Sequence, residues 1–224
     1  ATLAGTQGFN MNPGGIRNLT LSGNNTYTGV TTMSGGGMIY VKSNNALGAT
    51  GSGNGTTINY TSGSAVQLHF LNNVTSGEDI TVNINSSGTT GGNLIYNDSG
   101  NNTLTGNITL GRYSPNSTPT TGVDTFGIQS TAGTMTINGN IAGSAASGQA
   151  DGSVADQSRL QLRPTAAGAV VKINGVISDG TLTASTGTVV GGANGGLSVY
   201  TTSDSLGTAT LTGANTYTGS TVVS

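Results

Sequence analysis

The sequence predicts an all-β fold: a parallel β-helix (β-solenoid) with a few loop excursions and essentially no helix, forming one segment over residues 1–224. Its coil is expected to be right-handed by the general rule for parallel crossovers. Three observations lead to this prediction. Apolar residues alternate with Thr, Ser and Asn in short runs, segments rich in Gly and Asn close these runs, and a nine-residue motif near the start returns near the end. Internal repeats of this kind are typical of solenoid proteins.

The composition is neutral and dominated by small polar residues. Charged residues make up 6% of the chain, against about 25% in an ordinary soluble domain, and 39 residues are Gly. The formal net charge of −2 provides no basic surface for phosphate groups, which argues against binding to nucleic acids or anionic membranes. Disorder is the alternative for such a composition, but the regularly spaced apolar residues oppose it.

The chain contains no Cys, so its stability must come from packing and backbone hydrogen bonds rather than from disulfides. It also lacks an apolar run of about 18 residues, so no transmembrane helix is predicted. The first residues, ATLAGTQ, show no signal-peptide pattern. We therefore expect a processed chain or a piece of a longer one.

Strand-like alternation is clearest in four segments. In EDITVNIN, Ile80, Val82 and Ile84 would fall on one face and the Thr and Asn residues on the other, which is the pattern of a strand with one buried side. The same alternation assigns nine more residues to the core: Leu104, Ile108, Leu110, Met135, Ile137, Ile141, Val171, Ile173 and Ile177. None of these segments has the apolar spacing of an amphipathic helix.

Turns separate these strands, because Gly and Asn accept the positive φ values of sharp corners. Strand groups recur about every 15–25 residues, which suits one solenoid coil, although a meander of hairpins or a sandwich would also show short strands and turns. The solenoid is favoured because Gly106, Gly139 and Gly175 recur 33 and 36 residues apart, as a single structural position would. Outward Thr, Asn and Ser residues could also form hydrogen-bonded ladders between coils.

Two segments break the pattern and are predicted to be loop excursions. Residues 112–124 contain two Pro, which cannot donate a hydrogen bond within a central ladder. Residues 143–164 form the most charged region of the chain. Because loops often carry binding contacts, we take four of these residues as candidate ligand contacts, with a Ca²⁺ site at the two Asp as a minor alternative: Asp151, Asp156, Arg159 and Arg163.

The repeated motif reads LSGNNTYTG at residues 21–29 and LTGANTYTG at residues 211–219, with seven of nine positions identical. Each Tyr stands two residues before a Gly, so its ring is expected to cover a corner where the backbone turns; a platform for stacking a sugar is the alternative. We assign a structural role to the motif residues Leu21, Gly23, Asn25, Thr26, Tyr27, Thr28, Gly29, Leu211, Gly213, Asn215, Thr216, Tyr217, Thr218 and Gly219.

The segment LTLSGNNTYTGVTTMSGGGMIYVKSNNALG, residues 19–48, resembles the autotransporter-associated β-strand repeat, also called the passenger-associated transport repeat, of very large bacterial surface proteins. Residues 208–224 resemble the first half of a second copy, and residues 171–180 resemble the strand that often precedes such a copy. The family usually has Gly where Val30 and Ser220 stand. The resemblance implies a right-handed parallel β-helix in the passenger domain of an exported protein, extracellular or on the outer bacterial cell surface.

Catalysis is not expected. A glycosidase needs two carboxylates about 5–9.5 Å apart, whereas the eight acidic residues are scattered along the chain: Glu78, Asp79, Asp98, Asp124, Asp151, Asp156, Asp179 and Asp204. The single His, His69, alternates with Val66, Leu68 and Phe70 and is predicted to face solvent. No metal site or cofactor is predicted. A polysaccharide-binding or polysaccharide-degrading β-helix protein is the alternative.

These observations predict a structural or adhesive repeat segment that needs no active site. Its expected partners are other copies of itself or further repeats of the same chain, joined end to end, because an uncapped solenoid end exposes free backbone groups. Surface glycans are a second class of partner. At about 20 residues and 4.8 Å per coil, the super-repeat of about 190 residues would span about 45 Å. The segment is then either part of a passenger stalk or a subunit of a filament.

Overall fold

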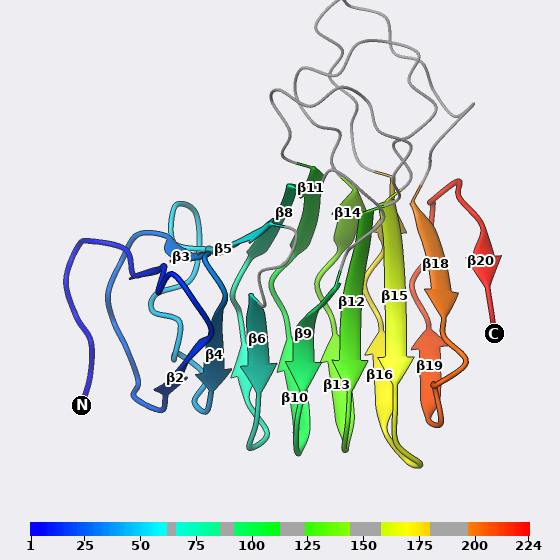
Figure 1. Cartoon of the computed structure of the whole chain (residues 1–224), viewed down its shortest axis with the longest axis horizontal. Coiled ribbons are helices and arrows are strands. Elements are labelled where there is room, and N and C mark those ends of the chain that lie inside the picture. The colour runs from blue at the N-terminus through cyan, green and yellow to red at the C-terminus, as the bar shows by residue number, and fades with distance from the viewer. Residues whose placement is uncertain (62–65, 86–91, 113–123, 144–157, 180–196) are drawn as a thin grey trace, which may run out of the picture.

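The computed structural model describes residues 1–61, 66–85, 92–112, 124–143, 158–179 and 197–224. Over these ranges every regular element is a β-strand, and no helix is present. The strands form three sheets, which we name sheets A, B and C, and every strand pairing in them is parallel. Figure 1 shows the strands of successive coils side by side along the long axis of the molecule.

Each sheet is a single file of short strands. Sheet A has the order β1 (Asn10–Met11), β3 (Thr31–Met33), β5 (Thr56–Thr61), β8 (Ile80–Asn85), β11 (Ile108–Arg112), β14 (Ile141–Gly143) and β17 (Ile177–Ser178). Sheet B has the order β2 (Arg17–Leu21), β4 (Gly37–Val41), β6 (Gln67–Phe70), β9 (Gly92–Asn97), β12 (Asp124–Ser130), β15 (Ser158–Pro164), β18 (Ser198–Thr201) and β20 (Thr221–Val222). Sheet C has the order β7 (Thr75–Ser76), β10 (Asn101–Leu104), β13 (Thr134–Ile137), β16 (Val170–Ile173) and β19 (Thr208–Leu211).

From β5 to β19 the chain visits sheets A, B and C in strict rotation. Each strand therefore lies beside the equivalent strand of the next coil, which confirms the predicted parallel β-solenoid. Hairpins would have placed antiparallel strands side by side, so the all-parallel pairing excludes the meander of hairpins.

The coils are longer than the sequence suggested, and they lengthen along the chain. Strand partners in sheet A are separated by 25, 24, 28, 33 and 36 residues in the pairs Thr31↔Thr56, Thr56↔Ile80, Ile80↔Ile108, Ile108↔Ile141 and Ile141↔Ile177. The expected 15–25 residues per coil is therefore wrong for the second half. As the coils grow from 28 to 33 and then 36 residues, the added residues lie in the connection from sheet A to sheet B, which occupies positions 86–91, 113–123 and 144–157 in these three coils.

The core fills the narrow space between the three sheets. All twelve residues that the alternation assigned to the core are at most 4% exposed, so those assignments are confirmed. Phe70 and Phe126 are the largest fully buried side chains. Burying an aliphatic or aromatic side chain of this size contributes about 1.5–3 kcal/mol, and this term is repeated in every coil.

A glycine column marks the corner between sheets C and A. A Cβ atom on Gly139 would overlap the carbonyl oxygen of Gly106, and one on Gly175 would overlap the carbonyl oxygen of Gly139. Gly106 and Gly213 meet the carbonyls of Glu78 and Gly175 in the same way. The predicted recurrence of one structural position is confirmed, with each interval equal to one coil.

Side-chain ladders run beside this glycine column. The backbone N–H of Asn107 donates to Oδ1 of Asp79 at 2.7 Å, and the N–H of Asn140 donates to Oδ1 of Asn107 at 3.0 Å. Oδ1 of Asn140 accepts in turn from Val176 N–H at 2.9 Å. Each amide or carboxylate thus satisfies a backbone donor in the following coil, as the abundance of Asn predicted.

The second predicted excursion ends too late. Residues 158–164 are strand β15, whose Leu160 and Leu162 are buried in the core. The prediction gave too much weight to the charges, and it set the boundary at Pro164. That proline is the last residue of the strand, where its carbonyl accepts a hydrogen bond from Gly207 and no donor is needed. Gly143, where that excursion was predicted to begin, ends β14, and the predicted bounds Arg112 and Asp124 of the other excursion belong to β11 and β12. Residues 144–157 and 113–123 lie outside the described residues.

Candidate functional site

In the first motif (residues 21–29), Tyr27 closes a buried chain of hydrogen bonds. Its hydroxyl lies 2.6 Å from Oγ1 of Thr31, and the Thr31 hydroxyl donates to the carbonyl of Leu47 at 3.2 Å. Tyr27 is 4% exposed. Burial raises the pKa of Tyr27, the hydrogen bond with Thr31 opposes this, and the nearby Glu78 adds to it. The Tyr27 side chain is thus packed inside the corner that the first motif forms.

Asn25 connects three successive coils. Its side-chain oxygen accepts from Leu3 N–H at 2.8 Å, and its side-chain nitrogen donates to the carbonyl of Ala46 at 2.6 Å. Because the amide has both a donor and an acceptor, it can bond to the coil before it and to the coil after it.

The segment 45–49, which we name the covering segment, lies over the first motif. The N–H of Asn25 donates to the carbonyl of Asn45 at 3.1 Å, and the N–H of Ala49 donates to the carbonyl of Tyr27 at 2.9 Å. Gly48 has φ +95°, and a Cβ there would stand 2.7 Å from the Tyr27 ring. Glycine is required at this position for both its conformation and its close approach.

The second motif (residues 211–219) repeats this local geometry. The Tyr217 hydroxyl lies 2.6 Å from Oγ1 of Thr221, the Asn215 side-chain oxygen accepts from Ile177 N–H at 2.9 Å, and Thr216 N–H donates to the carbonyl of Ile177 at 2.9 Å. Each contact has its counterpart in the first motif. The sequence repeat is therefore also a structural repeat.

The two copies are displaced from one another by one sheet. Leu21 ends β2 in sheet B, whereas Leu211 ends β19 in sheet C. Likewise, Thr31 begins β3 in sheet A and Thr221 begins β20 in sheet B. The super-repeat therefore covers six coils plus one further side. With longer coils than expected, it spans about 30 Å along the axis rather than 45 Å.

A row of stacked rings lies on the outer face of sheet B. His69 lies between Tyr40 and Tyr96, with ring centroids 4.7 and 4.5 Å away. Its ring nitrogens contact Asp98 Oδ2 at 2.9 Å and Gln67 Oε1 at 3.1 Å. His69 is on the predicted outer face, but it is only 7% exposed. The prediction that it faces solvent is wrong, because the parallel register places an aromatic ring on each side of it.

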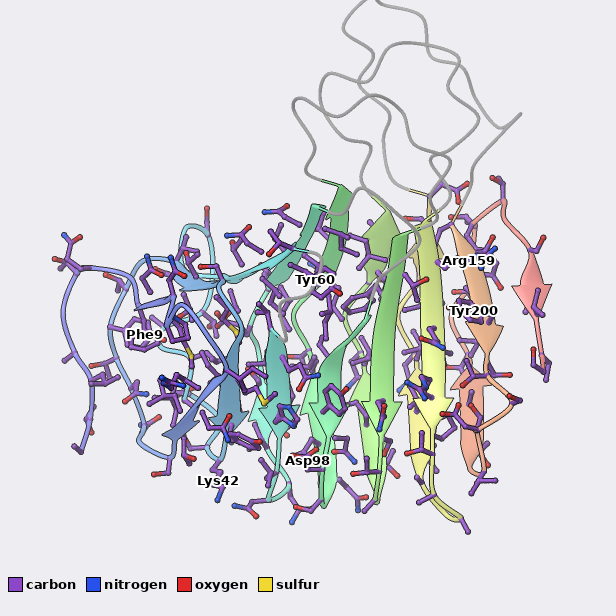
Figure 2. The ribbon with its side chains drawn as sticks, viewed as in Figure 1. Phe9, Lys42, Tyr60, Asp98, Arg159 and Tyr200 are labelled. Carbon is purple, nitrogen blue, oxygen red and sulfur yellow. The ribbon has the colours of Figure 1, made fainter. Side chains whose placement is uncertain are left out.

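Arg159 and Arg163, two of the candidate ligand contacts, lie on the outer face of the same sheet in β15. Arg159 lies over the ring of Tyr200, with its guanidinium carbon 5.7 Å from the centroid, and Figure 2 shows both near the C-terminal end of the rod. Arg163 pairs with Asp204, which lowers the pKa of that carboxyl group. The other two candidates, Asp151 and Asp156, lie outside the described residues.

Glu78, one of the eight scattered acidic residues, is a buried carboxyl group. It is 1% exposed, and its Oε1 accepts from the Thr56 hydroxyl at 2.7 Å. Among the described residues its Oε2 has no hydrogen-bond partner. Burial raises the pKa of Glu78 to about 7; the Thr56 hydrogen bond opposes this shift and Asp79 adds to it. The Glu78 carbonyl lies against Gly106 at the start of the glycine column. The only sequence signal for this position was the Gly that precedes Glu78.

The described residues contain no group of three His, Cys, Asp or Glu side chains placed to hold a metal ion. Across the same ranges, no helix is long and apolar enough to cross a bilayer. The side chains described above hold successive coils together. The glycine column allows the backbones to approach closely, and the amide ladders and Tyr corners form hydrogen bonds between or within coils.

Comparison with protein-family models, with curated proteins and with solved structures found no match. The resemblance of residues 19–48 to the autotransporter-associated β-strand repeat therefore stays a prediction. The structure adds that both copies of the motif make the same two contacts. In each copy the Tyr hydroxyl contacts a Thr hydroxyl, and the Asn side-chain oxygen accepts a hydrogen bond from the preceding coil.

Proposed function

We propose that this chain is a structural or adhesive β-solenoid segment of an extracellular bacterial surface protein, in which stacked coils provide a stiff spacer. Coil-to-coil hydrogen bonds run through all three sheets and through the amide ladders. Such a structure resists bending because backbone hydrogen bonds in the three sheets hold each coil to the next.

End-to-end contact is the second part of the proposal, and it is carried by the distribution of apolar surface. Among the described residues, the large apolar side chains that are exposed are Leu3, Ile16, Val30, Leu206, Val222 and Val223. All six lie in the first or the last coils, while the outer faces of the sheets between them are mainly hydroxyl and amide groups. Exposed apolar groups mark contact surfaces, so the ends are the surfaces suited to join further coils.

A polysaccharide-binding face has less support. Sugars stack on the open faces of aromatic rings, but both faces of His69 and one face each of Tyr40 and Tyr96 are covered by neighbouring rings. Arg159 lies over one face of Tyr200. The aromatic residues on sheet B therefore serve packing between coils.

Electron microscopy of purified chain 1–224 over a range of concentrations tests the end-to-end part. The eight strands of sheet B span about 34 Å. Fibres with an axial repeat of about 38 Å, which is eight strand spacings because the junction between copies adds one, would show that copies of the chain join end to end. Discrete rods about 34 Å long would assign the end contacts to further repeats of one polypeptide, and particles with no defined long axis would contradict the proposal.

A further inference from the structure

We propose that the exposed side of the second motif is a docking surface for one further solenoid coil of defined chemistry, a neutral coil carrying Asn-Ala-Leu-Gly. The inference rests on the proposed function, because it names the partner that an end of the rod accepts. It is argued from the first motif, where such a coil is already seated.

In the first motif the covering segment accepts hydrogen bonds from three polar groups of the corner. Carbonyls of Asn45, Ala46 and Leu47 accept from the Asn25 backbone, the Asn25 side chain and the Thr31 hydroxyl. These contacts leave Asn25 3% exposed and Thr31 fully buried. Ala46 and Leu47 are themselves at most 2% exposed, so the covering segment also closes the core.

The second motif makes the same contacts with the preceding coil, but among the described residues no segment equivalent to the covering segment lies over it. Among the described residues, nothing accepts from the Asn215 side-chain nitrogen and nothing donates to the Tyr217 carbonyl. The equivalent groups of the first motif bond to the covering segment. Thr221 is exposed, and Val223 is 83% exposed. The surface thus presents the same donor, acceptor and apolar groups that bond to or pack against the covering segment in the first motif.

This arrangement restricts the chemistry of the occupant. It must offer carbonyls to Asn215 and Thr221, an N–H to the Tyr217 carbonyl, and a glycine with positive φ above the Tyr217 ring. A charged ligand would leave its charge unpaired against apolar surface, and a residue other than glycine would collide with the ring, as the Gly48 geometry shows.

The test uses the chain's own covering coil. Residues 221–224 align with residues 31–34, so appending residues 35–61 after Ser224 continues the solenoid in register. The measurement is nitration of Tyr217 by tetranitromethane, mapped by mass spectrometry, with the buried Tyr27 as an internal reference. We expect the nitration rate of Tyr217 to fall by about tenfold or more in the extended chain, because reaction would then require local opening.

Two variants of the extended chain provide matched controls. Gly48→Val in the appended coil alone should return Tyr217 to its original reactivity, since the new side chain strikes the ring. Thr50→Ala in the appended coil changes a residue that is exposed in the first copy and should leave the protection intact. If Tyr217 is nitrated at the same rate in the parent and extended chains while both remain folded by circular dichroism, the docking proposal is overturned.

A concentration series with the parent chain distinguishes the sources of the coil. Protection of Tyr217 that increases with concentration would contradict the assigned chemistry, because residues 45–49 of a second copy already cover that copy's own first motif. Protection only in the extended chain would assign the coil to the same polypeptide. The stiffness of the rod is measured on the parent chain, so failure of docking and failure of the proposed function are separate results.

Discussion

Glu78 makes stability depend on pH through one residue. Its pKa is raised from 4.5 to about 7 by burial, so the folded state binds a proton more tightly than the unfolded state. The stabilisation from this proton is complete below about pH 4.5 and is lost as pH rises through 7.

Glu78→Gln should remove this dependence. The amide stays neutral and its oxygen can still accept from Thr56, so we expect the variant to gain on the parent as pH rises, by up to about 3 kcal/mol at pH 8. Urea unfolding at pH 4, 6 and 8 measures the difference. An offset that is the same at all three values would mean that the Glu78 carboxyl does not titrate as its burial requires.

Gly139 tests the glycine column. Gly139→Ala places a methyl group on the carbonyl of Gly106, so two coils must separate, and we expect a loss of about 2–3 kcal/mol in the free energy of unfolding. The matched control is Gly77→Ala, where the new Cβ would have its nearest neighbour at 3.5 Å and no positive φ is required. Equal stability of the two variants in urea would show that the column does not hold the coils at this spacing.

At the residue scale, the spacing of glycines predicted a structural feature correctly, whereas the exposure of an individual side chain could not be predicted. The recurrence of Gly106, Gly139 and Gly175 predicted a shared structural position, because only glycine fits where one coil lies on the carbonyl of the next. The burial of His69 could not be predicted, because it depends on which residues of other coils become its neighbours. The intervals from Tyr40 to His69 and on to Tyr96 equal local coil lengths, but those lengths were known only from the register.

At the scale of the motif, the two Tyr residues form a matched pair. Tyr27→Phe removes a buried hydroxyl from Thr31 and should cost about 1 kcal/mol. Tyr217→Phe removes the same hydrogen bond in an exposed setting, where water replaces it, and should cost close to nothing. Thermal unfolding of both variants measures the difference. A larger loss for Tyr217→Phe would contradict the assignment of the covered and uncovered copies.

Strands were predicted well where one face is apolar and poorly where charge interrupted the pattern. In β15 the alternation of Leu160 and Leu162 was present in the sequence, but neighbouring Arg residues led us to place it in a loop. Those Arg side chains lie on the outer face, where charge is compatible with a strand. A period of two shows which face of a strand is buried, but it does not show to which of three sheets the strand belongs.

On the scale of the whole molecule, the two copies of the repeated motif lie on different sides of the solenoid. The second motif lies one sheet further round than the first, because the coils between them have different lengths. Composition and alternation predicted the solenoid. The growth of the connections between sheets A and B, and with it the axial length of about 30 Å for the super-repeat, required the register of every strand pair.

The central claim is that the coils form one stiff rod, and an interspin distance measures it directly. The chain has no Cys, so spin labels can be attached only at Thr20→Cys on β2 and Val222→Cys on β20, both exposed residues at opposite ends of sheet B. Pulsed electron paramagnetic resonance should give a single narrow distribution near 34 Å, the length of seven strand spacings. A broad distribution, or a mean far from that length, would contradict the account.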